Sequence, residues 1–307
     1  MKVLVTGVNG QLGHDMMLEL KRRNHEPTGS GSGPEYRGHD SVAAMPYEQM
    51  NITDAQNVQD VLKRLQPDAV VHCSAWTAVD AAEEEGNREK VFSLNVNGTR
   101  NIAEACRAIG AKLVYLSTDY VFDGQGIRPW QPDDRNYAPL NVYGQSKLEG
   151  EFAVRETLEQ AFIVRIAWVF GRNGKNFIRT MLNVAKTHNT VRVVNDQIGT
   201  PTYTADLARL LTDMLETERY GTYHATNAET EPGAYISWYD FTCEIYRQAG
   251  LKVHVIPVST EEYGLSRAKR PFNSRLDKSK LLQEGFRPLP DWKDALARYL
   301  KELDGEI

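Results

Sequence analysis

The strongest constraint on the fold is a regular alternation of short apolar runs with amphipathic segments over the first 170 residues. The apolar runs lie at residues 3–6, 68–73, 112–118 and 162–169 and are typical of buried strands. Between these runs, apolar residues recur three or four positions apart, which is the spacing of an amphipathic helix. Strands that alternate with helices predict an α/β fold with a doubly wound parallel sheet.

A glycine turn follows the first predicted strand. Gly7, Gly10 and Gly13 stand three residues apart, and a helical apolar pattern begins at Leu12. Such a turn lets backbone N–H groups approach a pyrophosphate at the start of a helix, where the helix dipole favours negative charge. The spacing differs from the more common G-x-G-x-x-G, and the glycines could serve the turn alone. We interpret the segment as the cofactor turn of a Rossmann-type dinucleotide-binding domain.

The alternation becomes less regular after residue 170. We expect residues 1–170 to form the dinucleotide-binding Rossmann domain. One segment within residues 190–240 is expected to return to the sheet and join this domain. We expect residues 171–307 to form mainly a smaller substrate-binding lobe. Its predicted helices lie near 176–187, 203–216, 237–249 and 291–303.

The second strand is expected near Glu26–Ser30, although its glycines and proline weaken that prediction. An acid that would bind the ribose 2′-hydroxyl is missing where the Rossmann pattern places it, and Thr28, Gly29 and Ser30 stand there instead. Ser30 and the nearby Arg37 are suited to a 2′-phosphate. The alternative is a flexible loop with no such role. We therefore predict that NADPH is preferred and that NADH can also serve.

Tyr143 and Lys147 are four residues apart in a predicted helix and therefore share one helix face. A nearby ammonium favours the phenolate, so we expect Lys147 to lower the pKa of Tyr143. This arrangement makes Tyr143 a candidate general acid. A surface helix with no catalytic role would show the same short pattern.

The composition narrows the class of protein. The net charge is −5 and no block of Lys or Arg is present, which argues against nucleic acid or a membrane surface as the partner. The three cysteines form no C-x-x-C pair, and no Cys/His cluster predicts a metal site. No signal peptide or apolar run of about 20 residues is visible. We expect a soluble, cytoplasmic protein.

The order of the motifs resembles the extended short-chain dehydrogenase/reductase superfamily, and within it most closely the dTDP-4-dehydrorhamnose reductases. Besides the glycine turn, Asn95–Thr99 and the Tyr143/Lys147 pair, the resemblance rests on five further strings. They are Thr77–Asp80, Ser117–Asp123, Pro139–Gly144, Asn195–Pro201 and Arg270–Leu276.

The resemblance implies a catalytic set of Thr118, Tyr143 and Lys147, with Thr118 bonded to the substrate oxygen and Lys147 also holding the nicotinamide ribose. It implies further cofactor contacts at Gly10, Gln11, Leu12, Asn51, Ile52, Ser74, Ala75, Trp76 and Thr77. It implies contacts with the deoxysugar at Thr118, Asp119 and Trp168, and with the nucleotide diphosphate at Asn176, Arg270 and Asn273.

The expected activity is NAD(P)H-dependent reduction of the C4 ketone of a dTDP-linked 4-keto-6-deoxysugar, which gives dTDP-L-rhamnose. A reductase or an epimerase of another nucleotide-sugar would keep the same three catalytic residues. A non-catalytic nucleotide-binding regulatory subunit, resembling that of methionine adenosyltransferase, would need none of them. A homodimer remains open as an assembly.

Overall fold

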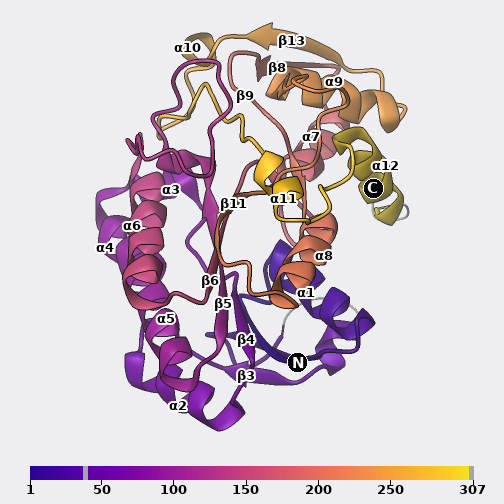
Figure 1. The fold of residues 1–307 in the computed structure, drawn as a ribbon. Helices are drawn as coiled ribbons and strands as arrows, with labels where there is room; N and C mark the ends of the chain where they lie inside the picture. The colour runs from indigo at the N-terminus through magenta and orange to yellow at the C-terminus, as the bar shows by residue number, and fades with distance from the viewer. Residues whose placement is uncertain (37–40, 304–307) are drawn as a thin grey trace.

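The computed structural model describes residues 1–36 and 41–303, and its centre is a parallel sheet of seven strands (Figure 1). The strand order is β11-β6-β5-β4-β1-β2-β3, and every neighbouring pair is parallel. The strands are β1 (Lys2–Thr6), β2 (Glu26–Gly31), β3 (Tyr47–Gln49), β4 (Ala69–His72), β5 (Lys112–Thr118), β6 (Ala161–Ile166) and β11 (Gly221–His224). The predicted α/β class and parallel sheet are confirmed.

Helices cover both faces of the sheet (Figure 1). On one face lie α2 (Ala55–Leu65), α5 (Gly98–Ile109) and α6 (Val142–Thr157), and on the other lie α1 (Gln11–Arg22) and α8 (Thr204–Leu215). Successive strand residues point to opposite faces. Val3 and Val5 accordingly pack with α1 and α8, and Leu4 packs with α2 and α5.

The remaining short elements are connections and the start of α5. They are η1 (Ser41–Ala44), α3 (Val79–Ala82), η2 (Glu85–Asn87), α4 (Arg88–Phe92), the π-helical turn η3 (Ser93–Asn97) and η4 (Asp119–Val121). Helical structure begins well before α5, because α4 and η3 run directly into it.

The second strand forms despite its glycines, because Gly29 allows a close packing that a larger residue would prevent. A Cβ at Gly29 would lie 2.9 Å from a methyl carbon of Val8. Gly29 is buried and its strand pairs with β1 over five residues, Lys2↔Glu26 to Thr6↔Ser30. The predicted second strand near Glu26–Ser30 is confirmed.

The late strand predicted over 162–169 is interrupted. It ends at Ile166, and a separate two-residue strand, β7 (Val169–Phe170), follows. Trp168 between them has φ of 51°, which takes the chain out of the extended conformation. Apolar composition could not reveal this break, because Ala167 and Trp168 continue the apolar run.

The C-terminal part has its own apolar core, built from α7 (Phe177–Ala185), α9 (Trp238–Gln248) and α12 (Trp292–Glu302). Three pairs of short strands join it: β8 (Thr190–Val194) with β13 (His254–Val258), β9 (Ile198–Gly199) with β12 (Ile236–Ser237), and β7 with β10 (Thr202–Tyr203). Two short helices, α10 (Thr260–Tyr263) and α11 (Ser279–Gln283), complete it.

Two elements of the later sequence lie with the central sheet. β11 pairs with β6, and α8 packs against α1. The boundary at residue 170 itself stays a prediction. No helix in the part of the chain that the structure describes is long and apolar enough to cross a bilayer.

Candidate active site

The glycine turn leaves the start of α1 open to an anion. Gly10 caps α1 in an extended conformation and contributes no side-chain hydrogen bond, and it is exposed. Gly7 adopts φ of 69°, and a Cβ at Gly13 would lie 2.4 Å from the Gly7 carbonyl oxygen. The turn thus requires glycine at these positions and presents unblocked first-turn amides. This geometry suits the pyrophosphate of a dinucleotide.

The loop after β4 lies directly beside this turn. The Ser74 amide donates to Thr6 Oγ1 at 3.0 Å, and a Cβ at Gly7 would meet the Ser74 nitrogen at 2.8 Å. Ala75 and Trp76 follow partly exposed, and Thr77 is exposed. The carboxyl ends of parallel strands form the ligand-binding edge of such sheets, and the loop lies at that edge. Its contacts with a cofactor stay predictions.

Other predicted cofactor residues are placed less directly. Gln11 begins α1 and its Oε1 accepts a hydrogen bond from Asn176, while Leu12 is buried in the core. Asn51 is exposed and caps its own turn through Thr53, whereas Ile52 is buried against α5. Their contacts with a cofactor stay predictions.

Two residues were predicted to bind a 2′-phosphate. Ser30 is fully buried in β2, and its Oγ has no hydrogen-bond partner among the residues that the structure describes. Its carbonyl accepts the Gly7 amide at 2.9 Å. Arg37 lies outside the described residues.

Thr118 and Tyr143 meet beyond the carboxyl end of β5. The Thr118 hydroxyl acts on Tyr143, where it opposes the rise that burial causes in the pKa of the phenol. Thr118 is the last residue of β5 and its Oγ1 also accepts the Tyr120 amide at 3.2 Å. Tyr143 stands in the first turn of α6, which begins there because the Asn141 side chain accepts the Gly144 amide at 2.7 Å.

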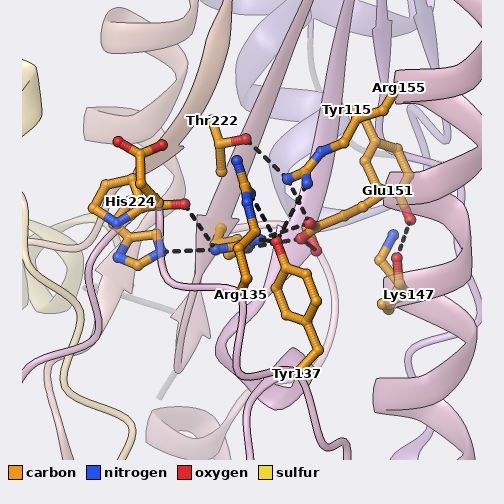
Figure 2. A network of polar contacts seen from close by, with 12 residues as sticks. Tyr115, Arg135, Tyr137, Lys147, Glu151, Arg155, Thr222 and His224 are labelled. Carbon is orange, nitrogen blue, oxygen red and sulfur yellow. Dashed lines mark hydrogen bonds and ion pairs between the residues drawn. The ribbon is translucent and has the colours of Figure 1, made fainter.

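Lys147 lies one turn further along α6 and is buried. Its Nζ is 4.1 Å from the centre of the Tyr115 ring, and the Tyr115 hydroxyl donates to the Lys147 carbonyl at 3.1 Å (Figure 2). Burial lowers the pKa of Lys147 to about 7, while the negative charge of Glu151 acts to raise it. A small change in its surroundings therefore changes its charge near neutral pH.

The expected effect of Lys147 on Tyr143 is wrong for the chain alone. Burial raises the pKa of Tyr143, the charge of Asp119 raises it further, and the Thr118 hydroxyl only partly opposes them. Removal from water disfavours the charged phenolate. Tyr143 thus keeps its proton at neutral pH, which is the state that a proton donor requires.

Asp119 lies beside this pair. It is buried, and Thr118 Oγ1 donates to its Oδ1 at 3.0 Å. Burial raises the pKa of Asp119 to about 6, against the opposing effect of the Ser274 and Thr118 hydroxyls. Its carboxyl group therefore titrates just below neutral pH at the predicted sugar position.

Trp168 follows β6, whose Ile166 pairs with Thr118, so it lies close to the same sheet edge. Its indole stacks on Trp238 with ring centroids 3.9 Å apart, and both side chains are half-buried. A bulky residue at φ of 51° is strained unless its surroundings hold it. The stack with Trp238 supplies such support, and the predicted sugar contact remains open to test.

Three predicted nucleotide-diphosphate contacts are engaged within the chain. Asn176 caps α7 and donates to Gln11, Gly171 and Tyr299. Asn273 is buried and donates to the carbonyls of residues 125 and 128. Arg270 forms a two-point ion pair with Asp80, with Nη2 at 2.6 Å from Oδ2. The charge of Arg270 also acts on Tyr120, two residues after Thr118.

One residue of the site was missed as a site residue. Asn95 in the π-helical turn accepts the Trp76 amide at 2.7 Å through Oδ1. Its Nδ2 donates to the Trp76 carbonyl and, at 2.9 Å, to Ser146 Oγ on α6. Asn95 thus joins the loop after β4 to the catalytic helix. Its presence in the Asn95–Thr99 motif was the available signal.

Metal-ligating groups were not expected, and the described residues contain no group of three or more His, Cys, Asp or Glu arranged to hold an ion.

Comparison with known proteins finds relatives that match this chain over nearly its full length. The chain is 38% identical to the spore coat polysaccharide biosynthesis protein SpsK of Bacillus subtilis, over 98% of this chain and 97% of that protein. It is 38% identical to a dTDP-4-dehydrorhamnose reductase of Streptomyces griseus, over 98% of this chain and 94% of that protein. The crystal structure of the Bacillus anthracis dTDP-4-dehydrorhamnose reductase in complex with NADP matches with a TM-score of 0.86 at 38% identity. The match covers 98% of this chain and 99% of that chain.

The family model for the RmlD substrate binding domain matches residues 1–304. The match therefore extends from the glycine turn through the Tyr143 helix and the C-terminal core, so it includes each part of the site described above. The chain belongs to the RmlD substrate binding domain family.

Proposed function

We propose that the chain is an NAD(P)H-dependent reductase that converts the C4 ketone of a dTDP-linked 4-keto-6-deoxysugar to the alcohol, giving dTDP-L-rhamnose. The observation that carries this proposal is the placement of Thr118 at the end of β5 beside Tyr143, with the buried Lys147 one helical turn further along α6. Relatives of similar length that are named as reductases of this substrate support it.

The glycine turn and the loop of residues 74–77 would hold the dinucleotide, and Lys147 would hold its nicotinamide ribose. When bound in its reduced form, that cofactor supplies a hydride. Thr118 orients the carbonyl oxygen of the substrate by a hydrogen bond. Tyr143 donates its proton to the oxygen as negative charge develops there.

The Lys147 ammonium has a second task in this scheme. Tyr143 becomes a phenolate when it gives up its proton, and burial makes that state costly. A positive charge one turn away on the same helix face offsets part of that cost. Protonated Lys147 is therefore the active form.

The test is to incubate the protein with NADPH and a panel of 4-keto nucleotide-sugars while following the absorbance of the reduced cofactor. We expect consumption with the dTDP-linked 4-keto-6-deoxysugar and formation of dTDP-L-rhamnose. Consumption only with another nucleotide-sugar would assign a different substrate. Isomerisation without net consumption would indicate an epimerase, and binding without turnover would indicate a regulatory subunit.

A further inference from the structure

Glu151 is a fully buried carboxylate beside the proposed catalytic helix face, and none of the catalytic roles above uses it as a contact with substrate or cofactor. It follows Lys147 by four residues on α6 and so lies one turn further along the same face. Figure 2 shows its carboxylate at the centre of a polar network between α6 and the sheet.

The carboxylate is bound from three elements. It accepts Ser117 Oγ on β5 at 2.6 Å, and Arg165 on β6 through Nε at 2.8 Å and Nη2 at 2.7 Å. Arg155 on α6 adds Nη2 at 3.0 Å. Burial alone would raise the pKa of Glu151, but the charges of Arg165 and Arg155 and the Ser117 hydroxyl hold it below its ordinary value. The group is therefore an ionised carboxylate.

The positions of these partners along the chain matter. Ser117 and Arg165 are directly paired across β5 and β6. Thr118 follows Ser117 at once, and Trp168 stands three residues after Arg165. The carboxylate thus fixes α6 against β5 and β6. Each group in this contact lies close to a proposed site residue, either one helical turn away on α6 or at most three residues away on the strands. A shift of α6 along or away from the sheet would break these hydrogen bonds.

Lys147 faces titratable groups from three elements: His72 and Cys73 at the end of β4, Tyr115 on β5, and Tyr143 and Glu151 on α6. Burial lowers the pKa of His72 to about 3 and raises that of Cys73 to about 12, so both are neutral at pH 7. Burial also raises the pKa of Tyr115 and of Tyr143. Among these described groups, Glu151 alone supplies a negative charge at neutral pH.

We propose that Glu151 is a positioning residue for the proposed reduction, holding α6 in register with β5 and β6 and keeping the Lys147 ammonium charged. The kinetic consequences of this role rest on the proposed function. Its effect on the charge of Lys147 is a property of the folded chain and can be measured by cofactor binding alone.

The decisive variant is Glu151→Gln, which removes the charge and keeps the size of the side chain. The matched control is Glu149→Gln on the same helix, because Glu149 is only half-buried and its recorded partner is Gln145. The pH profile of kcat/KM and the pH dependence of the NADPH dissociation constant, from fluorescence quenching, are measured for each.

Loss of a nearby opposite charge lowers the pKa of an ammonium group by about 1 unit or more. We expect Glu151→Gln to move the alkaline fall in kcat/KM to lower pH by about 1 unit, and to move the alkaline loss of NADPH affinity with it. Glu149→Gln should leave both unchanged. A folded Glu151→Gln protein with both curves unmoved would overturn the electrostatic role.

Because Glu151→Gln weakens the buried ion pair, Ser117→Ala provides a second test that changes no charge. It removes one hydrogen bond to the carboxylate beside Thr118. We expect kcat to fall by about three- to tenfold with an unchanged KM and an unmoved pH profile, on the scale of one hydrogen bond. Unchanged kcat would overturn the positioning role. If the unaltered protein reduces no keto-sugar, the proposed function fails, whereas the NADPH-binding curves still decide the electrostatic role of Glu151.

Discussion

The two halves of the central sheet hold their functional edges in different ways. At β1 and β2, the edge is built from backbone groups, with the Gly7 amide bonded to the Ser30 carbonyl and no room for a Cβ at Gly13. At β5 and β6, it is built from buried side-chain charges, with Arg165 and Glu151 both inaccessible to solvent. The first half is therefore sensitive to added volume, and the second to lost charge.

The difference also separates the two tasks of the site. A dinucleotide pyrophosphate is recognised by amides and a helix dipole, which need only a tight turn. Proton transfer depends on the protonation states of Tyr143 and Lys147, which respond to every nearby charge. Charges buried beneath α6 are therefore suited to the proton-transfer half.

The largest effect should come from breaking the buried pair. We expect Arg165→Met to lower the free energy of unfolding by about 3–5 kcal/mol, because Glu151 is left buried without its main partner. Urea unfolding followed by circular dichroism measures it. Arg100→Met is the matched control, since the pair of Arg100 with Glu156 spans 3.5 Å at the surface and should contribute about 1 kcal/mol or less.

The double variant Glu151→Gln/Arg165→Met sharpens this test. Removing both charges avoids the unpaired carboxylate, so part of the stability lost in Arg165→Met should return. A double variant that loses the sum of the two single effects would show that the two residues do not act as a pair.

Next in size is the loss of the proposed proton donor. We expect Tyr143→Phe to reduce turnover by about 10² or more, equivalent to roughly 2.7 kcal/mol in the barrier, while the NADPH dissociation constant stays nearly unchanged. Tyr220→Phe is the control, because the Tyr220 hydroxyl has no hydrogen-bond partner within the described part of the chain. Near-normal turnover by the Tyr143 variant would remove this residue from the mechanism.

A smaller effect is expected from added side-chain volume in the glycine turn beside β1 and β2. Gly13→Ala brings a Cβ to 2.4 Å from the Gly7 oxygen, so the turn must shift at a cost of about 1–3 kcal/mol. We expect weaker NADPH binding with little change in the pH profile. At Gly86, no described atom beyond the two chain neighbours lies within 4 Å of an added Cβ, so Gly86→Ala should bind NADPH normally. Equal behaviour of the two variants would contradict the steric account of the turn.

The sequence revealed those features that depend on local spacing. The strands and the start of α1 follow from apolar runs and glycines, and the shared face of Tyr143 and Lys147 follows from a four-residue interval. It could not reveal the Glu151 network, because Ser117 is 34 positions from Glu151 and the two meet only in the folded sheet.

Two further differences have similar physical origins. The break at Trp168 depends on a backbone angle that apolar composition does not encode, and its stacking partner Trp238 comes 70 residues later in a different element. The raised pKa of Tyr143 depends on burial, which opposes the effect expected from Lys147 alone. Pairwise spacing along a helix accounts for neither.

The smallest predicted effect concerns the cofactor and returns to the β1–β2 half. A carboxylate at the end of β2 would repel a 2′-phosphate, and the acids nearby do not supply one. Glu26 is the first residue of β2. It lies five residues before the last residue of that strand, roughly 16 Å away along the strand. Glu48 on β3 is bound to Arg64 at 2.9 Å through both oxygens.

We therefore predict a preference for NADPH over NADH of about tenfold, which needs only some 1.4 kcal/mol. Steady-state kinetics with each cofactor measures the ratio of specificity constants. Ser32→Asp should reverse it, since Ser32 is exposed directly after β2. Glu35→Gln, which alters an exposed acid three residues further on, should leave the ratio unchanged or raise it. Equal specificity constants for NADPH and NADH in the unaltered protein would mean that the absence of an acid is insufficient to select NADPH. They would also mean that buried Ser30 makes no contact with the 2′-phosphate.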